Sequence, residues 1–131
     1  MQLSHERPDY AWVLRGADSR RAKVNDRILE RSFALAPDRL IEDWAAPATA
    51  AALEPAHLDA LLALAPELLV LGTGQRQLFP PAAVMAACLT RGIGIEVMDN
   101  AAAARTYNVL AGEGRRVVVA LLLADAAAHP V

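Results

Sequence analysis

The sequence predicts a layered α/β fold, in which helices cover a mixed central sheet and the N-terminal half adds an antiparallel β-meander. Three observations predict this fold. Strand-like and helix-like segments alternate after Trp44, short strand-like segments separated by turns precede it, and residues 117–123 are apolar at every position. A strand that is apolar throughout is typical of the buried centre of a sheet. We therefore expect a single-domain sandwich.

The length and composition fit one folded domain. The 131 residues suit a single domain over residues 1–131, with the meander at about 10–44 and the alternating part at about 55–123. Hydrophobic residues make up 55% of the chain and charged residues 21%, which favours a packed core over disorder. The net charge of -2, without a basic stripe, argues against nucleic-acid binding.

The sequence also predicts a cytoplasmic protein that does not insert into a membrane. The N-terminus lacks the pattern of a signal peptide, and the longest strongly apolar run, residues 117–124, is far shorter than the roughly 20 residues of a transmembrane helix. Cys88 is the single cysteine, which excludes an internal disulfide and fits a reducing compartment.

The N-terminal half shows strand-like segments rich in aromatic, branched and other apolar residues. We expect strands at residues 10–14, 28–36 and 39–43. The turn-forming residues between them predict turns at residues 16–21, 25–26 and 37–38. Arg31 interrupts the apolar face of the longest strand, which indicates a bulge or a partly exposed edge there. Together these segments predict an antiparallel meander.

The C-terminal half alternates helices with strands. Helices are expected at about residues 55–65, from 80–81 to 92, and from 99–100 to about 110, and strands at residues 68–71, 93–98 and 117–123. Prolines open the first two helices, and Gly92 suits the left-handed position that closes the second. Asp99 or Asn100 can cap the third helix. This order predicts parallel strands joined by right-handed crossovers.

A glycine-rich loop follows the strand at residues 68–71. Gly72 and Gly74 match the first two glycines of a dinucleotide-binding fingerprint, but Gln77 occupies the third position. No Gly-Lys-Ser/Thr sequence is present, which excludes a P-loop. Pro80 and Pro81 remove two N–H donors from the following helix terminus. The loop is thus a phosphate or nucleotide site, a site for another small polar ligand, or a structural turn.

Other polar residues fall near the same strand ends. Asp99 stands where a dinucleotide protein places its ribose-binding acid, but a helix cap explains it equally. Asn108 can tie two backbone segments together or contact a ligand. Because open α/β sheets bind ligands at the carboxyl ends of their strands, the candidate ligand-binding residues are Gly72, Thr73, Gly74, Gln75, Arg76, Asp99, Asn100, Arg105 and Asn108.

The sequence shows no catalytic constellation, and we predict no catalytic residue, metal or cofactor. His5, His57 and His129 are scattered, without cysteines or carboxylates at metal-ligand spacing. Cys88 lies on a predicted helix without a neighbouring positive charge, which favours a buried and inert thiol. No serine or threonine stands in a nucleophile elbow.

Several motifs resemble those of an uncharacterised-domain family. These are Gly72-Thr73-Gly74, then residues 96–98, 105–108 and 113–115, in that order. The family includes a mitochondrial respiratory complex I assembly factor, the adipogenesis-associated domain protein and many small bacterial and archaeal proteins. The resemblance implies a layered α/β domain with no reaction firmly tied to it.

Two functions therefore remain open from the sequence. The first is a non-catalytic binding or assembly-factor-like module, whose protein partner belongs to a membrane or respiratory assembly. The second is a small-molecule site, anionic or nucleotide-like, at the strand ends near residues 72–74 and Asp99. Such a site could include an enzyme with Asp99 as its general base.

Overall fold

The apolar segment at the end of the chain forms the central strand of the main sheet. The computed structural model describes residues 10–124. Strand β8 (Val117–Leu121) is buried at every position. It pairs in parallel with β6 (Leu68–Gly72) and antiparallel with β4 (Phe33–Ala36). The outer strands are β5 (Arg39–Ile41) and β7 (Gly94–Met98), in the order β5-β4-β8-β6-β7. The predicted mixed central sheet is confirmed.

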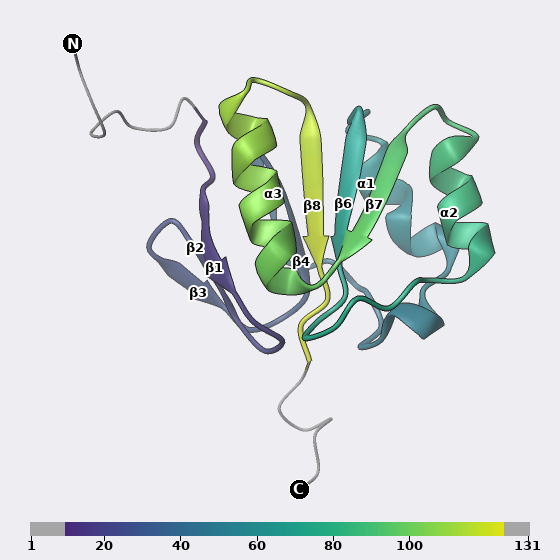
Figure 1. Cartoon of the computed structure of the whole chain (residues 1–131), viewed down its shortest axis with the longest axis horizontal. Helices are drawn as coiled ribbons and strands as arrows, with labels where there is room; N and C mark the ends of the chain where they lie inside the picture. The colour runs from purple at the N-terminus through teal and green to yellow at the C-terminus, as the bar shows by residue number, and fades with distance from the viewer. Residues whose placement is uncertain (1–9, 125–131) are drawn as a thin grey trace, which may run out of the picture.

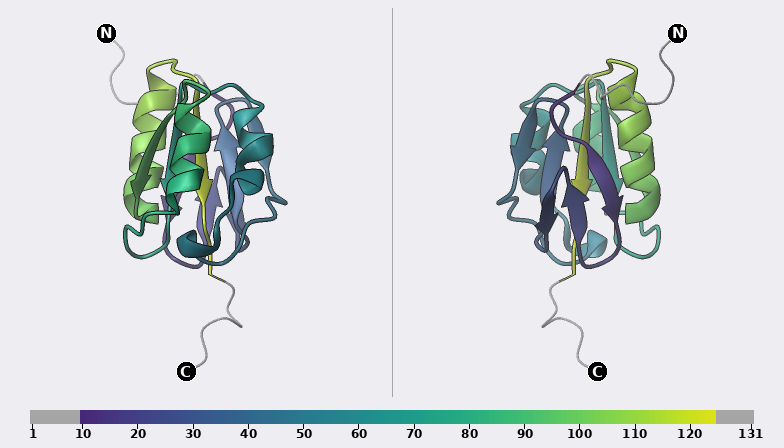
Figure 2. Two further views of the ribbon diagram at one scale, coloured as in Figure 1. Left: turned by 90° about the vertical axis from the view of Figure 1, so that its right-hand side faces the viewer. Right: turned by 90° about the vertical axis from the view of Figure 1, so that its left-hand side faces the viewer.

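Helices cover both faces of this sheet. Helix α3 (Asn100–Gly112) lies on one face (Figure 1). Helices α1 (Asp59–Leu62) and α2 (Ala82–Leu89) lie on the other, as the edge-on views in Figure 2 show. Two 3-10 turns, η1 (Ala50–Ala52) and η2 (Pro55–Leu58), precede α1. Because the sheet separates them, the structure has two hydrophobic cores, one on each face.

The N-terminal strands form a second, smaller sheet. Strands β1 (Leu14–Ala17), β2 (Ala22–Val24) and β3 (Arg27–Leu29) pair antiparallel in sequence order, which confirms an N-terminal meander. It is shorter than the predicted range of about 10–44, because β4 and β5 pair in the main sheet. The small sheet packs beside α3, and its apolar side chains share a core with that helix (Figure 1). No helix among residues 10–124 has the length and apolar character needed to cross a bilayer.

The prediction of a single strand at residues 28–36 is wrong. The chain leaves the small sheet after Leu29 and enters the main sheet at Phe33. Ser32 is buried at this crossing, and its hydroxyl oxygen accepts a hydrogen bond from the Leu123 N–H at 2.9 Å. Arg31 is exposed on the link. The arginine that interrupted the apolar pattern therefore marks a change of sheet, not a bulge.

Several other boundaries also differ from expectation. The strand expected at residues 10–14 begins only at Leu14 and runs to Ala17. Its pairing with β2 has a register shift between Leu14 and Gly16. The turn begins at Asp18, because its carboxylate accepts hydrogen bonds from the N–H groups of Arg20 and Arg21. The helix expected at 55–65 is shorter, because Ala65 adopts a left-handed conformation with φ of 51°.

Candidate functional site

The glycine loop, residues 72–78, lies where two parallel strands end together. Gly72 at the end of β6 is in register with Met98 at the end of β7, and α3 starts two residues later. The N–H of Asn100 donates to the Gly74 carbonyl at 2.8 Å. Gly74 has φ of 102°, a conformation that glycine adopts without strain. The loop and the start of α3 are thus in direct contact, as parallel strands predict.

Asn100 joins this loop to two other segments. Its side chain is fully buried. Its Oδ1 accepts from the Gly74 N–H at 3.0 Å, and its Nδ2 donates to the carbonyls of Asp18 at 2.9 Å and Leu122 at 3.0 Å. The amide therefore connects the glycine loop, the first turn of the meander and the end of the central strand. It lies at the carboxyl ends of the parallel strands β6 and β8, the side of the sheet on which open α/β folds bind ligands.

Thr73 and Gln77 hold the rest of the loop against the protein. Thr73 donates its hydroxyl hydrogen to the Arg76 carbonyl at 2.6 Å, and the same oxygen accepts from the Leu78 N–H at 3.0 Å. The Gln77 amide donates to the Val97 carbonyl of β7 at 2.8 Å. A phosphate cradle needs loop N–H groups that point outward. Those of Gly74 and Leu78 are instead used within the protein.

Gly72 allows a close approach between elements. A Cβ atom at this position would lie 2.3 Å from the Leu121 side chain and 2.4 Å from Oδ1 of Asn100. These distances are too short for any side chain to fit without movement of its neighbours. In a dinucleotide site, a glycine makes room for a pyrophosphate. Here the glycine makes room for the Asn100 amide.

Asp99 is the N-cap of α3. Its carboxylate accepts from the Ala102 N–H at 2.8 Å, so the capping alternative describes its role in the structure. Beside it lies a hollow of about 300 Å³, bounded by Gly74, Gln75 and the turn at Asp18. Hydrogen bonds from the Arg20 and Arg21 N–H groups lower the pKa of Asp18, which keeps its carboxylate charged. Arg20 also lines the hollow, but the carboxylates of Asp18 and Asp99 outnumber this one cation and disfavour a phosphate there.

The remaining candidates lie away from this hollow. Arg105 is exposed on α3, and Arg76 is exposed in the glycine loop. Asn108 pairs with the backbone of β1: its Oδ1 accepts from the Leu14 N–H at 3.1 Å and its Nδ2 donates to the Leu14 carbonyl at 2.5 Å. The Tyr107 hydroxyl donates to the Trp12 carbonyl at 2.7 Å. Asn108 and Tyr107 therefore attach the meander to α3.

Metal-ligating side chains and the single cysteine can be placed within the described residues. No group of three or more histidines, cysteines and carboxylates with metal-binding geometry occurs among residues 10–124. Cys88 is buried in the core under α2, and this burial raises the pKa of its thiol. A thiol with a raised pKa is a weak nucleophile at neutral pH.

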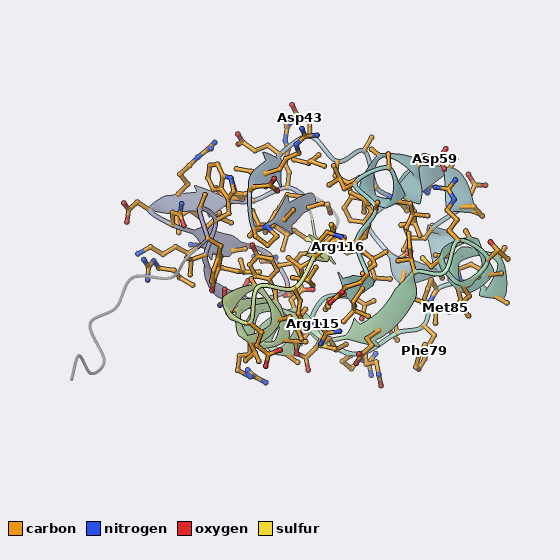
Figure 3. All side chains as sticks on the ribbon, turned by 90° about the horizontal axis from the view of Figure 1, so that it is seen from above. Asp43, Asp59, Phe79, Met85, Arg115 and Arg116 are labelled. Atoms are coloured by element: carbon orange, nitrogen blue, oxygen red, sulfur yellow. The ribbon has the colours of Figure 1, made fainter. Side chains whose placement is uncertain are left out.

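One surface feature was not identified from the sequence. Helix α2 has the sequence AAVMAACL, without a charged residue, and only Val84 and Cys88 are buried. Leu89, the last residue of α2, is 61% exposed, and Phe79, in the segment before the helix, is 64% exposed. We call Leu78, Phe79, Met85 and Leu89 the α2 face. Figures 1 and 2 place α2 at the outer edge of the molecule beyond β7, and Figure 3 shows Phe79 and Met85 along the same side.

Solved structures of bacterial proteins are similar to this chain, among them one from Xanthomonas campestris and one from Bordetella pertussis. The chain is 59% identical to the Xanthomonas campestris protein XCC1710, with a TM-score of 0.79 over 94% of this chain and 92% of that one. It is 29% identical to a Mth938-like domain protein of Bordetella pertussis, with a TM-score of 0.79 over 99% and 98% of the two chains. Both structures are structural-genomics targets.

A further bacterial protein and the model of a protein family also match this sequence. Over 65 residues the chain is 37% identical to a Francisella tularensis protein described as "13 kDa major membrane protein". The match spans 50% of this chain and about half of that relative, 53% of its length. Residues 14–122 match the model of a family described as "Protein of unknown function (DUF498/DUF598)". That range includes all thirteen described elements up to β8, and the chain belongs to this DUF498/DUF598 family.

Proposed function

We propose that this protein is a non-catalytic binding module, similar in role to an assembly factor, and that a protein partner docks on the α2 face. The observation that carries the proposal is the uncharged helix α2, whose outer side remains exposed together with Phe79. A helix that is apolar all round is normally buried on all sides. Here the sheet buries only one side, which supports a partner that covers the other.

The chemistry of the α2 face suits a protein interface. Phe79 is a large aromatic side chain of the kind that anchors interfaces, and Leu78 and Leu89 supply further apolar area. Complete burial of such a side chain contributes about 1.5–3 kcal/mol. Strand β7 beside it is an edge strand, so its outward backbone groups are open to a partner except where the Gln77 amide covers the Val97 carbonyl.

A membrane-associated or respiratory assembly is the proposed setting, with the module itself acting from the cytoplasm. The description of the Francisella tularensis relative as a major membrane protein supports a membrane-associated partner. The resemblance of the sequence to an uncharacterised-domain family that includes a mitochondrial respiratory complex I assembly factor supports the same setting. In this setting the module binds through protein contacts at the α2 face.

Affinity capture from native cell lysate, under conditions that preserve membrane complexes, tests the proposal. We expect Phe79→Ser to reduce the recovered partner at least tenfold, because a polar side chain removes the aromatic anchor. The matched control is Ile28→Ser, which replaces an apolar side chain, 53% exposed, on β3 of the small sheet. This control should recover the partner as the unchanged protein does.

Three outcomes would contradict the proposal. Equal partner recovery by Phe79→Ser and the unchanged protein would show that the α2 face is not the docking surface. Self-association of the purified chain that Phe79→Ser abolishes would make the face an interface between copies. Co-sedimentation with protein-free lipid vesicles that depends on Phe79 would make it a membrane-binding surface.

The hollow beside the glycine loop carries a second candidate function. We infer that a small polar ligand, contacting Gly74, Gln75 and Asp99, is the alternative occupant of the strand ends. An amide NMR titration with pooled nucleotides, phosphates, carboxylic acids and amines tests it. Because Asp18 and Asp99 border the hollow, we expect amines to shift these signals more than anions do. A spectrum unchanged by every pool would exclude this candidate.

A further inference from the structure

A groove of about 720 Å³ lies at the carboxyl end of the central strand β8. Its charged side chains come from three arginines and one acid: Arg20 and Arg21 on the first turn of the meander, and Arg31 and Glu30 on the link between the two sheets. Leu123 forms part of the floor. The groove thus combines a volume typical of small-ligand sites with a local excess of positive charge.

The three arginines have no ion-pair partner among residues 10–124. The ion pairs there join Arg27 to Glu42, Arg91 to Asp59 and Arg115 to Glu67. The nearby Asp18 carboxylate accepts hydrogen bonds from backbone N–H groups, and the charges of Arg21 and Arg20 contribute less than these bonds to its lowered pKa. Guanidinium groups bind phosphate and carboxylate oxygens in pairs, with a geometry that lysine does not provide. Clustered guanidinium groups in one groove therefore favour an anionic ligand.

Ser32 supplies a buried polar group at the same groove. Its side chain is only 9% exposed, and its oxygen accepts from the Leu123 N–H at 2.9 Å. No described residue accepts the hydroxyl hydrogen, which leaves it able to donate to a ligand. The apolar part of the wall comes from Trp44, Ala46 and Ala48. The indole N–H of Trp44 donates to the His57 carbonyl at 2.7 Å, and this bond fixes the ring.

We propose that this groove binds a small anionic molecule, with phosphate or carboxylate groups held by Arg20, Arg21 and Arg31 and an apolar body against Trp44. The position agrees with the general rule that open α/β sheets bind ligands outside the carboxyl ends of their strands. The site differs from the glycine loop, where the N–H groups of Thr73, Gly74 and Leu78 bond to the protein itself. It is also independent of the α2 face, so either proposal can fail alone.

Two probes distinguish a phosphate ligand from a carboxylate ligand. The full chain is titrated with inorganic pyrophosphate in one experiment and with citrate in the other, followed by amide and arginine side-chain NMR signals. We expect shifts concentrated at residues 20–21, 31–32 and 123 with at least one probe. A response to pyrophosphate alone assigns a phosphate ligand, and a response to citrate alone assigns a carboxylate ligand.

Matched charge variants complete the test. Arg21→Gln and Arg31→Gln should each weaken binding at least tenfold, whereas Arg91→Gln, which removes the same charge at the end of α2, should change it less than twofold. Arg31→Lys keeps the charge but loses the paired donors, so intermediate binding is expected. Equal weakening by Arg91→Gln, or no shift at the groove with either probe, would overturn the proposal.

Discussion

The Gly72→Ala variant is expected to lose about 3 kcal/mol of unfolding free energy, near the upper end of the usual cost of overpacking a core. The added Cβ would lie 2.3 Å from the Leu121 side chain and 2.4 Å from Oδ1 of Asn100. Leu121 belongs to the buried central strand, and the Asn100 oxygen cannot move without losing its hydrogen bond to Gly74. Urea denaturation measures the change.

Gly16→Ala is the matched control for this prediction. Gly16 also lies in a strand, but a Cβ built there has no neighbouring atom within 4 Å. We expect this variant to differ from the unchanged protein by less than about 1 kcal/mol, since neither a clash nor a positive φ opposes the alanine. A Gly72→Ala variant as stable as Gly16→Ala would mean that the loop and the start of α3 are not packed as described.

The Asn100→Ala variant is expected to be the most destabilising polar truncation, at about 3–5 kcal/mol. It leaves the Gly74 N–H and the carbonyls of Asp18 and Leu122 without this partner, and an unsatisfied buried polar group costs about 1–3 kcal/mol. Because these bonds join three segments, we also expect faster amide exchange at Gly74 and at the first turn of the meander. Denaturation and hydrogen exchange measure the two effects.

The neighbouring Asp99→Ala variant separates this role from helix capping. Asp99 makes one capping bond, to the Ala102 N–H, and its side chain is only partly buried. Loss of such a cap costs about 1 kcal/mol. If Asp99→Ala destabilises the protein as much as Asn100→Ala, the central role assigned to the Asn100 amide is wrong.

Local sequence signals predicted much of the fold. The apolar run of β8, a helix cap at Asp99 or Asn100 and the left-handed Gly92 were each predicted from neighbouring residues, and the structure confirms the run and Gly92 and places the cap at Asp99. The change of sheet at residues 30–32 could not be predicted in the same way. It depends on the pairing of β4 with β8, whose residues lie far away in the sequence. Arg31 indicated the irregularity but not its cause.

The candidate site was harder to predict for a related reason. A strand followed by glycines is shared by loops that hold phosphates and by loops that approach another element closely, and Asn100 lies 26 residues beyond Gly74. Nothing in the local sequence shows which of Asp99 and Asn100 points inward. The α2 face and the groove lined by Arg20, Arg21 and Arg31 exist because other parts of the fold leave them exposed. The sequence pattern does not show which surfaces remain exposed.

The most direct test of the binding-module proposal is hydrogen exchange of the chain alone and within the complex recovered from native lysate. We predict that residues 78–81 and helix α2 (Ala82–Leu89) become protected in the complex. The strands of the small sheet and the glycine-loop residues 72–74 should exchange as they do in the free protein. Protection confined to the glycine loop or the small sheet, with α2 unchanged, would contradict the proposal that the partner docks on the α2 face.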